Sequence, residues 1–220
     1  MKVILLDIEG TTTDINFVHQ ELFPYAAQRM GPFLSEQAET PAVAQALAQV
    51  AEETGAQGLE ALTQVLLDWT QQDRKAGPLK QLQGLIWEQG YQKGELKGHV
   101  YADVRPAFER WSAQGLRLAI YSSGSVLAQK LIFGHSSAGD LCPYLSAYFD
   151  TAVGGKKEAA SYTQIALQLN QPPAEILFLS DIPAELAAAQ AAGLQVTELR
   201  RDGAEPDGAY PWAADFTGLG

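Results

Sequence analysis

VILLDIEGTTT, residues 3–13, opens with apolar residues and changes character at Asp7. A short apolar run bounded by turn residues is typical of a strand buried on both faces of a sheet, which predicts a strand over Val3–Leu6. Asp7, Glu9 and the Gly10–Thr13 turn follow this strand directly. Open α/β sheets bind ligands beyond the carboxyl ends of their strands, so both carboxyl groups lie where a site is expected.

Further apolar runs predict four more strands, at Leu116–Tyr121, Tyr148–Val153, Ile176–Leu179 and Gln195–Leu199. Amphipathic helical patterns alternate with them, at Asp103–Ala113, Val126–Phe133, Ser161–Leu169 and Pro183–Ala192. Such alternation favours a parallel sheet with helices on both faces. The expected fold class is therefore α/β, a doubly wound parallel sheet. The Gly-, Pro- and Asp-containing segment Arg200–Gly220 is expected to be loop.

A helical insertion separates the first two strands. Helices are expected at Leu22–Phe33, Pro41–Glu53, Leu59–Arg74 and Leu79–Gln89, with breaks at Gly31-Pro32, Gly55, Gly58 and Gly77-Pro78. This gap is too long for one crossover helix. We expect two domains: a catalytic core of residues 1–15 and 100–220, and an all-helical cap of residues 16–99 inserted after the first strand.

The amino-acid composition and net charge of the chain exclude several classes of protein and of binding partner. The 220 residues are 46% hydrophobic and 19% charged, which is typical of a folded chain rather than a disordered one. A formal net charge of −11 disfavours nucleic acid and anionic membrane surfaces as partners. Cys142 is the single cysteine, which excludes an internal disulfide and a CxxC zinc site. No apolar run fits a signal peptide or a membrane span, so we expect a cytoplasmic protein.

The ends of the other predicted strands also carry polar groups. The second strand is followed by Ser122-Ser123-Gly124-Ser125, the third by Gly154-Gly155-Lys156-Lys157, and the fourth by Ser180-Asp181. Because the carboxyl ends of parallel strands meet at one edge of a sheet, these groups and Asp7 are expected to form one site.

A carboxylate nucleophile, a magnesium ion, a phosphate cradle and a lysine are the groups that phosphoryl transfer through an aspartyl-phosphate requires. Asp7 is the expected nucleophile, and Asp7 and Asp181 are suited to bind one Mg²⁺ through oxygen. The metal would offset the repulsion between an anionic nucleophile and an anionic substrate. Asp181 also has an alternative role, because it could instead cap the helix that begins at Pro183.

The remaining groups suit the phosphate and the leaving oxygen. Ser122 and Ser123 precede a helix start and fit phosphate oxygens, although either could serve only as a helix cap. Lys156 would neutralise charge on the transferring group. Glu9 is placed to protonate the leaving oxygen and then to activate water. Glu185 could join the metal shell through water or lie on a solvated helix face.

The motifs DIEGTT, SSGS, Lys156 and SDIPAE resemble the haloacid dehalogenase superfamily of phosphatases. Longer segments are similar to the enolase-phosphatase family of methionine salvage, from the first strand to about Arg200. These segments are LLDIEGTTTDINFVHQELFPYA (Leu5–Ala26), LQGLIWEQGYQKGELKG (Leu82–Gly98), YSSGSVLAQKLIFGHSSAGDL (Tyr121–Leu141), GGKKEAASYTQIA (Gly154–Ala166) and FLSDIPAELAAAQAAG (Phe178–Gly193).

This resemblance implies a reaction, a cofactor and a set of roles. The family converts 2,3-diketo-5-methylthiopentyl-1-phosphate through its enol to an acireductone and phosphate, with one Mg²⁺, commonly as a monomer. It implies metal contacts from Asp7, from the backbone carbonyl of Glu9 and from Asp181, and it favours Lys156 over Lys157 as the phosphate lysine. The wider superfamily usually has Asp where Glu9 stands, and the extra methylene of Glu9 moves its carboxyl group outward.

Three other functions share parts of this pattern. A phosphomonoesterase for another small phosphate ester would have the same core residues and differ only in its cap. A dehalogenase is disfavoured, because Glu9 would have no leaving alcohol to protonate. A phospho-accepting receiver module is disfavoured as well, because its acceptor Asp follows the third strand, where this chain has Val153-Gly154, and because it has no helical insertion.

Overall fold

The computed structural model describes residues 1–204 and 208–219, and the chain divides into two compact units. The first unit comprises Met1–Ile15 and Lys97–Gly220, and the second comprises Asn16–Leu96. The sequence predicted that the chain returns from the cap to the core at residue 100, and the second segment of the first unit begins at Lys97. The two units are described separately below.

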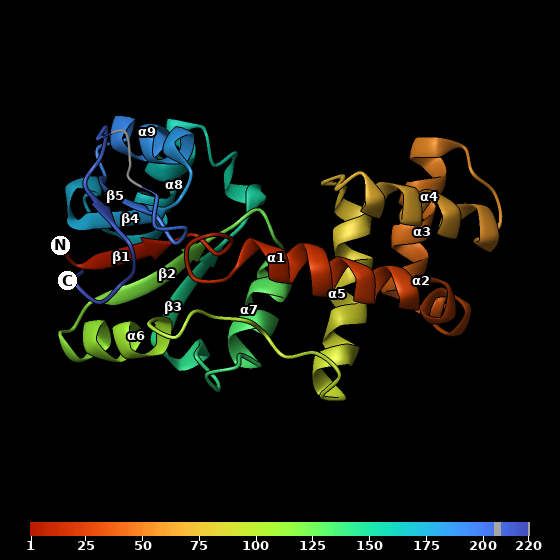
Figure 1. The fold of residues 1–220 in the computed structure, drawn as a ribbon. Helices are drawn as coiled ribbons and strands as arrows, with labels where there is room; N and C mark the ends of the chain where they lie inside the picture. The colour runs from red at the N-terminus through yellow and green to blue at the C-terminus, as the bar shows by residue number, and fades with distance from the viewer. Residues whose placement is uncertain (205–207, 220) are drawn as a thin grey trace. The chain divides into compact units, whose positions relative to one another are not determined.

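The first unit is built on a parallel sheet with strand order β3-β2-β1-β4-β5-β6 (Figure 1). The strands are β1 (Val3–Leu6), β2 (Arg117–Tyr121), β3 (Leu145–Phe149), β4 (Ile176–Ser180), β5 (Gln195–Leu199) and β6 (Trp212–Ala213). The strand order reverses between β1 and β4, so the switch point of the sheet lies beside Asp7, which directly follows β1.

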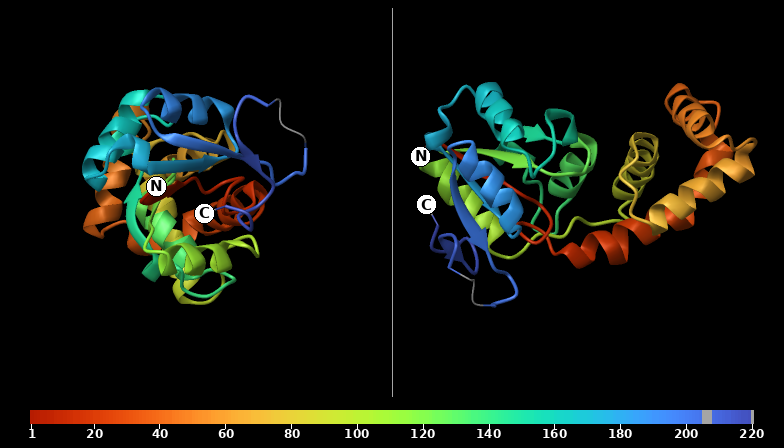
Figure 2. Two further views of the ribbon diagram at one scale, coloured as in Figure 1. Left: turned by 90° about the vertical axis from the view of Figure 1, so that its left-hand side faces the viewer. Right: turned by 90° about the horizontal axis from the view of Figure 1, so that it is seen from above.

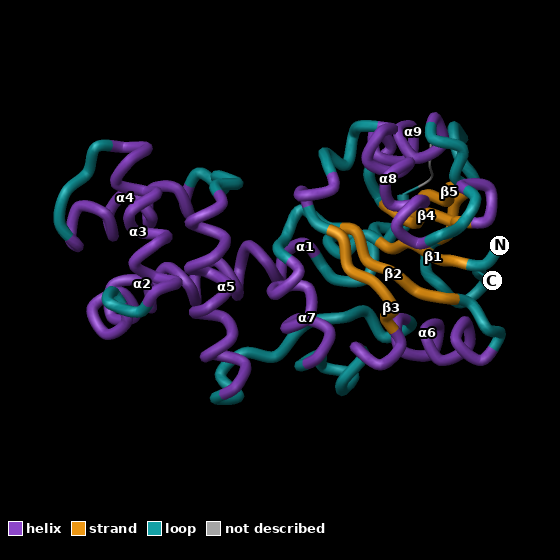
Figure 3. Tube along the Cα trace, turned by 180° about the vertical axis from the view of Figure 1, so that it is seen from behind, coloured by secondary structure: helices purple, strands orange, loops and turns teal. Residues whose placement is uncertain are grey.

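Helices cover both faces of this sheet, as the views from opposite sides show (Figures 1 and 3). On one face lie α6 (Val104–Ala113) and α7 (Val126–Gly134), and on the other lie α8 (Ala159–Leu169) and α9 (Pro183–Ala191). Alternate residues of β1 point to opposite faces of the sheet. Ile4 and Leu6 pack with α6, whereas Val3 and Leu5 pack with α8 and α9. The predicted doubly wound α/β fold is confirmed.

The third strand and the C-terminal segment differ from expectation. The predicted strand Tyr148–Val153 begins earlier, at Leu145, and residues Thr151–Val153 form the 3₁₀ turn η3. Asp150 starts this turn because its Oδ1 accepts a hydrogen bond from the Ala152 N–H at 2.9 Å. The segment expected to be loop contributes β6, whose two residues pair with β5. Two further 3₁₀ turns, η2 (Cys142–Tyr144) and η4 (Pro173–Glu175), precede β3 and β4.

The second unit is helical, with α2 packed against α4 and α5 (Figure 2). Its elements are α1 (Ile15–Phe17, which begins in the first unit), the π-helical turn η1 (Val18–Leu22), α2 (Phe23–Gln37), α3 (Pro41–Thr54), α4 (Leu59–Gln71) and α5 (Gly77–Gln92). The expected break at Gly31-Pro32 is wrong, because Pro32 lies inside α2. Burial of Met30, Phe33 and Leu34 around it favours the continuous helix over the loss of one backbone hydrogen bond.

None of the helices in the described part of the chain is both long enough and apolar enough to cross a membrane.

Candidate active site

A pocket of about 420 Å³ lies within the first unit, at the carboxyl ends of β1, β2 and β4. Acidic side chains outnumber basic ones in its lining, with five carboxyl groups against two lysines. The lining residues are Asp7, Glu9, Ile15, Ser122, Ser123, Thr151, Gly155, Lys156, Lys157, Glu158, Asp181, Ile182 and Glu185. A phosphate ester is itself an anion, so its binding in this pocket would require a positively charged group beside the phosphate.

The turn after β1 fixes the Asp7 carboxylate. Its Oδ1 accepts a hydrogen bond from the Ile8 N–H at 2.7 Å, and the carbonyl of Ile8 accepts from the N–H groups of residues 11–13. Gly10 completes the turn at φ +73°. A Cβ on Gly10 would lie 2.2 Å from Asp181 Oδ2, so glycine is needed for these two loops to approach each other.

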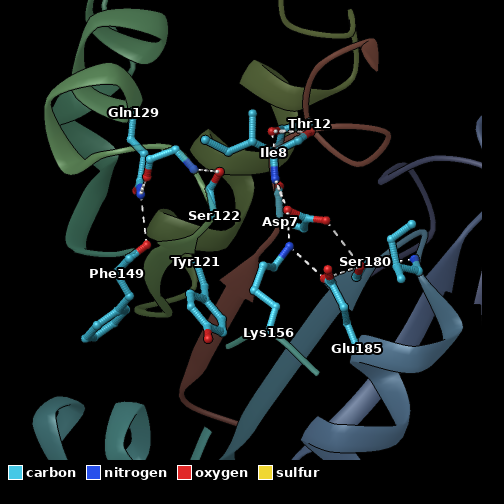
Figure 4. A network of polar contacts seen from close by, with 12 residues as sticks. Asp7, Ile8, Thr12, Tyr121, Ser122, Gln129, Phe149, Lys156, Ser180 and Glu185 are labelled. Carbon is cyan, nitrogen blue, oxygen red and sulfur yellow. Dashed lines mark hydrogen bonds and ion pairs between the residues drawn. The ribbon is translucent and has the colours of Figure 1, made fainter. Parts of the chain in front are cut away.

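Lys156 joins two buried carboxylates across the pocket (Figure 4). Its Nζ lies 2.6 Å from Asp7 Oδ1 and 2.6 Å from Glu185 Oε2, and its side chain is 11% exposed. Burial lowers the pKa of Lys156, but the charges of Asp7 and Glu185 outweigh burial, so its pKa is raised. The lysine is therefore a charged group held beside the Asp7 carboxylate.

Ser180 connects the same two carboxylates from the end of β4. Its Oγ lies 3.2 Å from Asp7 Oδ2 and 3.1 Å from Glu185 Oε2, and it accepts a hydrogen bond from the Ile182 N–H. The single hydroxyl proton can serve one carboxylate at a time. Burial and the nearby Asp7 charge raise the pKa of Glu185. Both oxygens of Asp7 therefore lie within hydrogen-bond distance of a donor, Oδ1 of the Ile8 N–H and Lys156 Nζ, and Oδ2 of Ser180 Oγ.

Asp181 has the environment of a cation ligand. Its Oδ1 is buried and has no hydrogen-bond partner among the described residues. Burial and the charge of Asp7 raise the pKa of Asp181 to about 7. No group of three or more His, Cys, Asp or Glu side chains in the described part of the chain could hold a metal ion unaided. A hard cation such as Mg²⁺ fits this donor set, since it binds few carboxylates and keeps several waters.

The side chain of Gln129 holds the loop after β2 (Figure 4). The Gln129 Nε2 donates hydrogen bonds to the carbonyls of Gly124, at 2.9 Å, and Phe149, at 2.8 Å. Ser122 is buried, and its Oγ accepts a hydrogen bond from the Gly124 N–H at 3.1 Å. One buried amide therefore ties the Ser122-Ser123 loop to the end of β3.

The structure brings all the predicted site residues to one pocket: Asp7, Glu9, Ser122, Ser123, Lys156 and Asp181 line it. Lys157 also lines it but is exposed. Glu185, which the sequence left open, bonds Lys156 directly. The linking roles of Ser180 and Gln129 were not predicted. The signal for Gln129 was a polar residue within the apolar run of α7, on a face that the fold buries completely.

The chain matches the family model of the haloacid dehalogenase-like hydrolases over residues 1–193. That match gives the class of the protein, a hydrolase, and this chain has Asp7, Lys156 and Asp181 at the carboxyl edge of its parallel sheet. The enolase-phosphatase E1 of Marinobacter nauticus is 52% identical, over 99% of this chain and 96% of that protein. The enolase-phosphatase E1 of Drosophila melanogaster is 54% identical, over 92% of this chain and 84% of that protein. The chain belongs to the enolase-phosphatase E1 family of haloacid dehalogenase-like hydrolases.

A solved structure has the same fold as this chain. The crystal structure of the UTR4 protein of Saccharomyces cerevisiae is 36% identical in sequence and superposes with a TM-score of 0.84. The match covers 99% of this chain and 99% of that chain. The likeness therefore includes both the sheet unit and the helical unit.

Proposed function

We propose that this protein carries out the enolase-phosphatase reaction of methionine salvage at the pocket beside Asp7. The substrate is 2,3-diketo-5-methylthiopentyl-1-phosphate, which passes through its enol to 1,2-dihydroxy-3-keto-5-methylthiopentene, an acireductone, and phosphate. The carrying observation is the Asp7 carboxylate at the sheet's switch point, held by the Lys156 ammonium at 2.6 Å. The identity to enolase-phosphatases over the whole chain supports this substrate.

Mg²⁺, one per chain, is the proposed cofactor. The carboxylates of Asp7 and Asp181 and the backbone carbonyl of Glu9 would hold it, and the unpartnered Asp181 Oδ1 supports this assignment. When bound, the ion supplies positive charge for the phosphate ester and for the two carboxylates.

The phosphatase half-reaction is assigned to the chain's own residues. Enol formation moves a proton from the carbon that bears the phosphate ester to the neighbouring carbonyl oxygen. Asp7 then attacks phosphorus, and the bond from phosphorus to the ester oxygen breaks. Glu9 gives its proton to the departing oxygen and then takes one from the water that cleaves the aspartyl-phosphate. Lys156 neutralises phosphoryl charge, and Ser122 and Ser123 bind phosphate oxygens.

The pocket needs no second chain, since the residues that line it come from one unit. We therefore include a monomeric state in the proposal, tested by sedimentation. A cytoplasmic location, tested by cell fractionation, completes it. The net charge of −11 supports a small-molecule substrate rather than a nucleic-acid or membrane partner.

A ³¹P NMR time course with the diketo phosphate and Mg²⁺ tests the assignment. An enol-phosphate signal that rises and falls before free phosphate accumulates is the expected result. Hydrolysis of other phosphate esters with no turnover of this compound would instead favour a phosphomonoesterase of different specificity.

Asp7→Asn separates the two half-reactions. Asparagine retains an acceptor for the Ile8 N–H but cannot form the phosphoenzyme, so phosphate release should fall by about 10³-fold or more. Enol formation should persist in part, because that step needs no nucleophile. Phosphate release near the wild-type rate would refute the role of Asp7.

A further inference from the structure

Lys156 lies on an irregular loop between η3 and α8, outside the regular backbone hydrogen-bond ladders of helix and sheet. Instead, three consecutive carbonyls, those of residues 154–156, each accept a hydrogen bond from a side-chain hydroxyl. The donors are Tyr121 Oη to residue 154 at 3.0 Å, Ser161 Oγ to residue 155 at 2.8 Å, and Tyr162 Oη to residue 156 at 2.6 Å. This series fixes the path of the loop carbonyl by carbonyl.

The three donors are among the most buried polar groups of the first unit. Tyr121 and Tyr162 are 0% exposed and Ser161 is 1% exposed. Tyr121 ends β2, whereas Ser161 and Tyr162 lie in the first turn of α8. The two tyrosine rings meet edge to face at 5.4 Å, and Tyr162 packs on Phe178 of β4 at 5.1 Å. The donors are therefore held by the core itself.

Glycine allows the loop to come this close to α8. Gly154 has a φ of +128°, and a Cβ there would lie 2.2 Å from Ser161 Oγ. Such a contact does not occur between real atoms, so a side chain at this position would push the loop away from its serine donor.

The position of the loop decides where the ammonium of Lys156 stands. Four rotatable bonds separate its backbone from Nζ, and functional groups need placement to within about 0.5 Å. The same Nζ reaches Asp7 and Glu185 at 2.6 Å each and lies 5.9 Å from the centre of the Tyr121 ring. A loop free to shift would lose these contacts first.

We propose that Tyr121, Ser161 and Tyr162 are positioning residues for Lys156. Their hydroxyls hold the loop so that the ammonium is directed at the phosphate position beside Asp7 (Figure 4 shows Tyr121 and Lys156). This inference rests on the proposed function, in which Lys156 neutralises the charge of the phosphoryl group that Asp7 receives. It assigns the KEAASY segment, residues 157–162, a task distinct from binding substrate itself.

The test removes one oxygen atom at a time. Tyr162→Phe and Ser161→Ala keep the packed side chain but delete the donor, and Tyr144→Phe is the control. The Tyr144 hydroxyl bonds the exposed Glu109 at 3.3 Å and does not line the pocket. Calorimetric binding of inorganic phosphate in the presence of Mg²⁺ should weaken about three- to tenfold in each test variant. Tyr144→Phe should bind as the wild type does.

A second background distinguishes positioning from a general structural role. In Lys156→Ala, adding Tyr162→Phe should cause no further weakening, because the group being positioned is absent. Two results would overturn the positioning role and leave the proposed function standing. One is that Tyr162→Phe weakens phosphate binding equally in the wild-type and Lys156→Ala backgrounds. The other is that Tyr162→Phe and Ser161→Ala bind phosphate as the wild type does, although Lys156→Ala binds it weakly. Unchanged binding by Lys156→Ala would refute the proposed role of the lysine, and the positioning role with it.

Discussion

Gly10 and Gly55 share one backbone conformation but differ in their surroundings. Both have a φ of +73°, which L side chains rarely adopt. A Cβ on Gly10 would lie 2.2 Å from Asp181 Oδ2, whereas a Cβ on Gly55 would have no described atom within 4 Å. Comparing the two glycines therefore separates the cost of the backbone conformation from the cost of displacing the Asp181 carboxylate.

We expect Gly55→Ala to lower the free energy of unfolding by about 1 kcal/mol. Gly10→Ala should cost about 1–3 kcal/mol more, because the new methyl group collides with Asp181. Urea denaturation of both variants measures this difference. Gly10→Ala should also raise the Mg²⁺ concentration needed for phosphate release, whereas Gly55→Ala should not. Equal effects of the two substitutions would show that the Gly10–Asp181 contact does not matter.

At the scale of elements, the segment after β5 is tied to the nucleophile loop. The Nε and one terminal nitrogen of Arg201 donate hydrogen bonds to the carbonyl of Thr11 at 3.0 and 2.8 Å, and its other terminal nitrogen pairs with Asp103 at 2.8 Å. Its guanidinium lies 4.3 Å from the centre of the Tyr101 ring and 4.6 Å from that of Phe216. The C-terminal segment thus supports the turn that presents Asp7.

Arg201→Met should therefore affect both stability and catalysis. It leaves Asp103 and the carbonyl of Thr11 without a charged partner, at a cost of about 3 kcal/mol in the free energy of unfolding. Arg105→Met, which removes an exposed pair with Glu109, should cost no more than about 1 kcal/mol. Urea denaturation and phosphate release measure the two effects. A kcat of Arg201→Met equal to that of the wild type would contradict the inference that Arg201 supports the turn after Asp7.

Local patterns predicted β1 and β5 with the bounds that the structure gives. For β1 the reason is that a strand buried on both faces is a continuous apolar run. They misplaced β3, an edge strand with half-exposed residues, and extended it across Asp150, where a side chain starts a turn. The contact between Arg201 and Thr11 joins residues 190 positions apart, and no local pattern indicates it.

The candidate site shows the same difference between features that local sequence patterns indicate and features that depend on contacts between distant residues. Asp7, Lys156 and Asp181 were predictable because each follows a strand, and parallel strands bring their ends together. Ser180, Tyr121 and Tyr162 were not, because their roles depend on which buried acceptor each hydroxyl meets. Side chains that support functional groups carry no spacing signal of their own.

At the scale of the whole molecule, part of the −11 net charge lies at the pocket, where five acidic side chains face two lysines. Without a cation, burial and the charge of Asp7 raise the pKa of Asp181 to about 7, above its ordinary value of 3.8. The folded metal-free protein then binds more protons than the unfolded chain between these two values. Its free energy of unfolding should therefore fall as the pH rises from about 4 to about 7.

Asp181→Asn should remove the part of that fall that Asp181 causes and leave the part that Glu185 causes, since the pKa of Glu185 is also raised. In EDTA at pH 8, the variant should melt at a higher temperature than the wild type. As the pH falls below 3.8, the two melting temperatures should converge, because Asp181 is then mostly protonated in the folded and in the unfolded state. Addition of Mg²⁺ should raise the Tm of the wild type and leave that of the variant nearly unchanged, since ligand binding stabilises only the protein that binds it. Scanning calorimetry under these conditions measures all three effects. A wild-type protein that melts above Asp181→Asn in EDTA at pH 8 would mean that Asp181 stabilises the fold, and the metal would no longer be needed to explain why a buried carboxylate stands there.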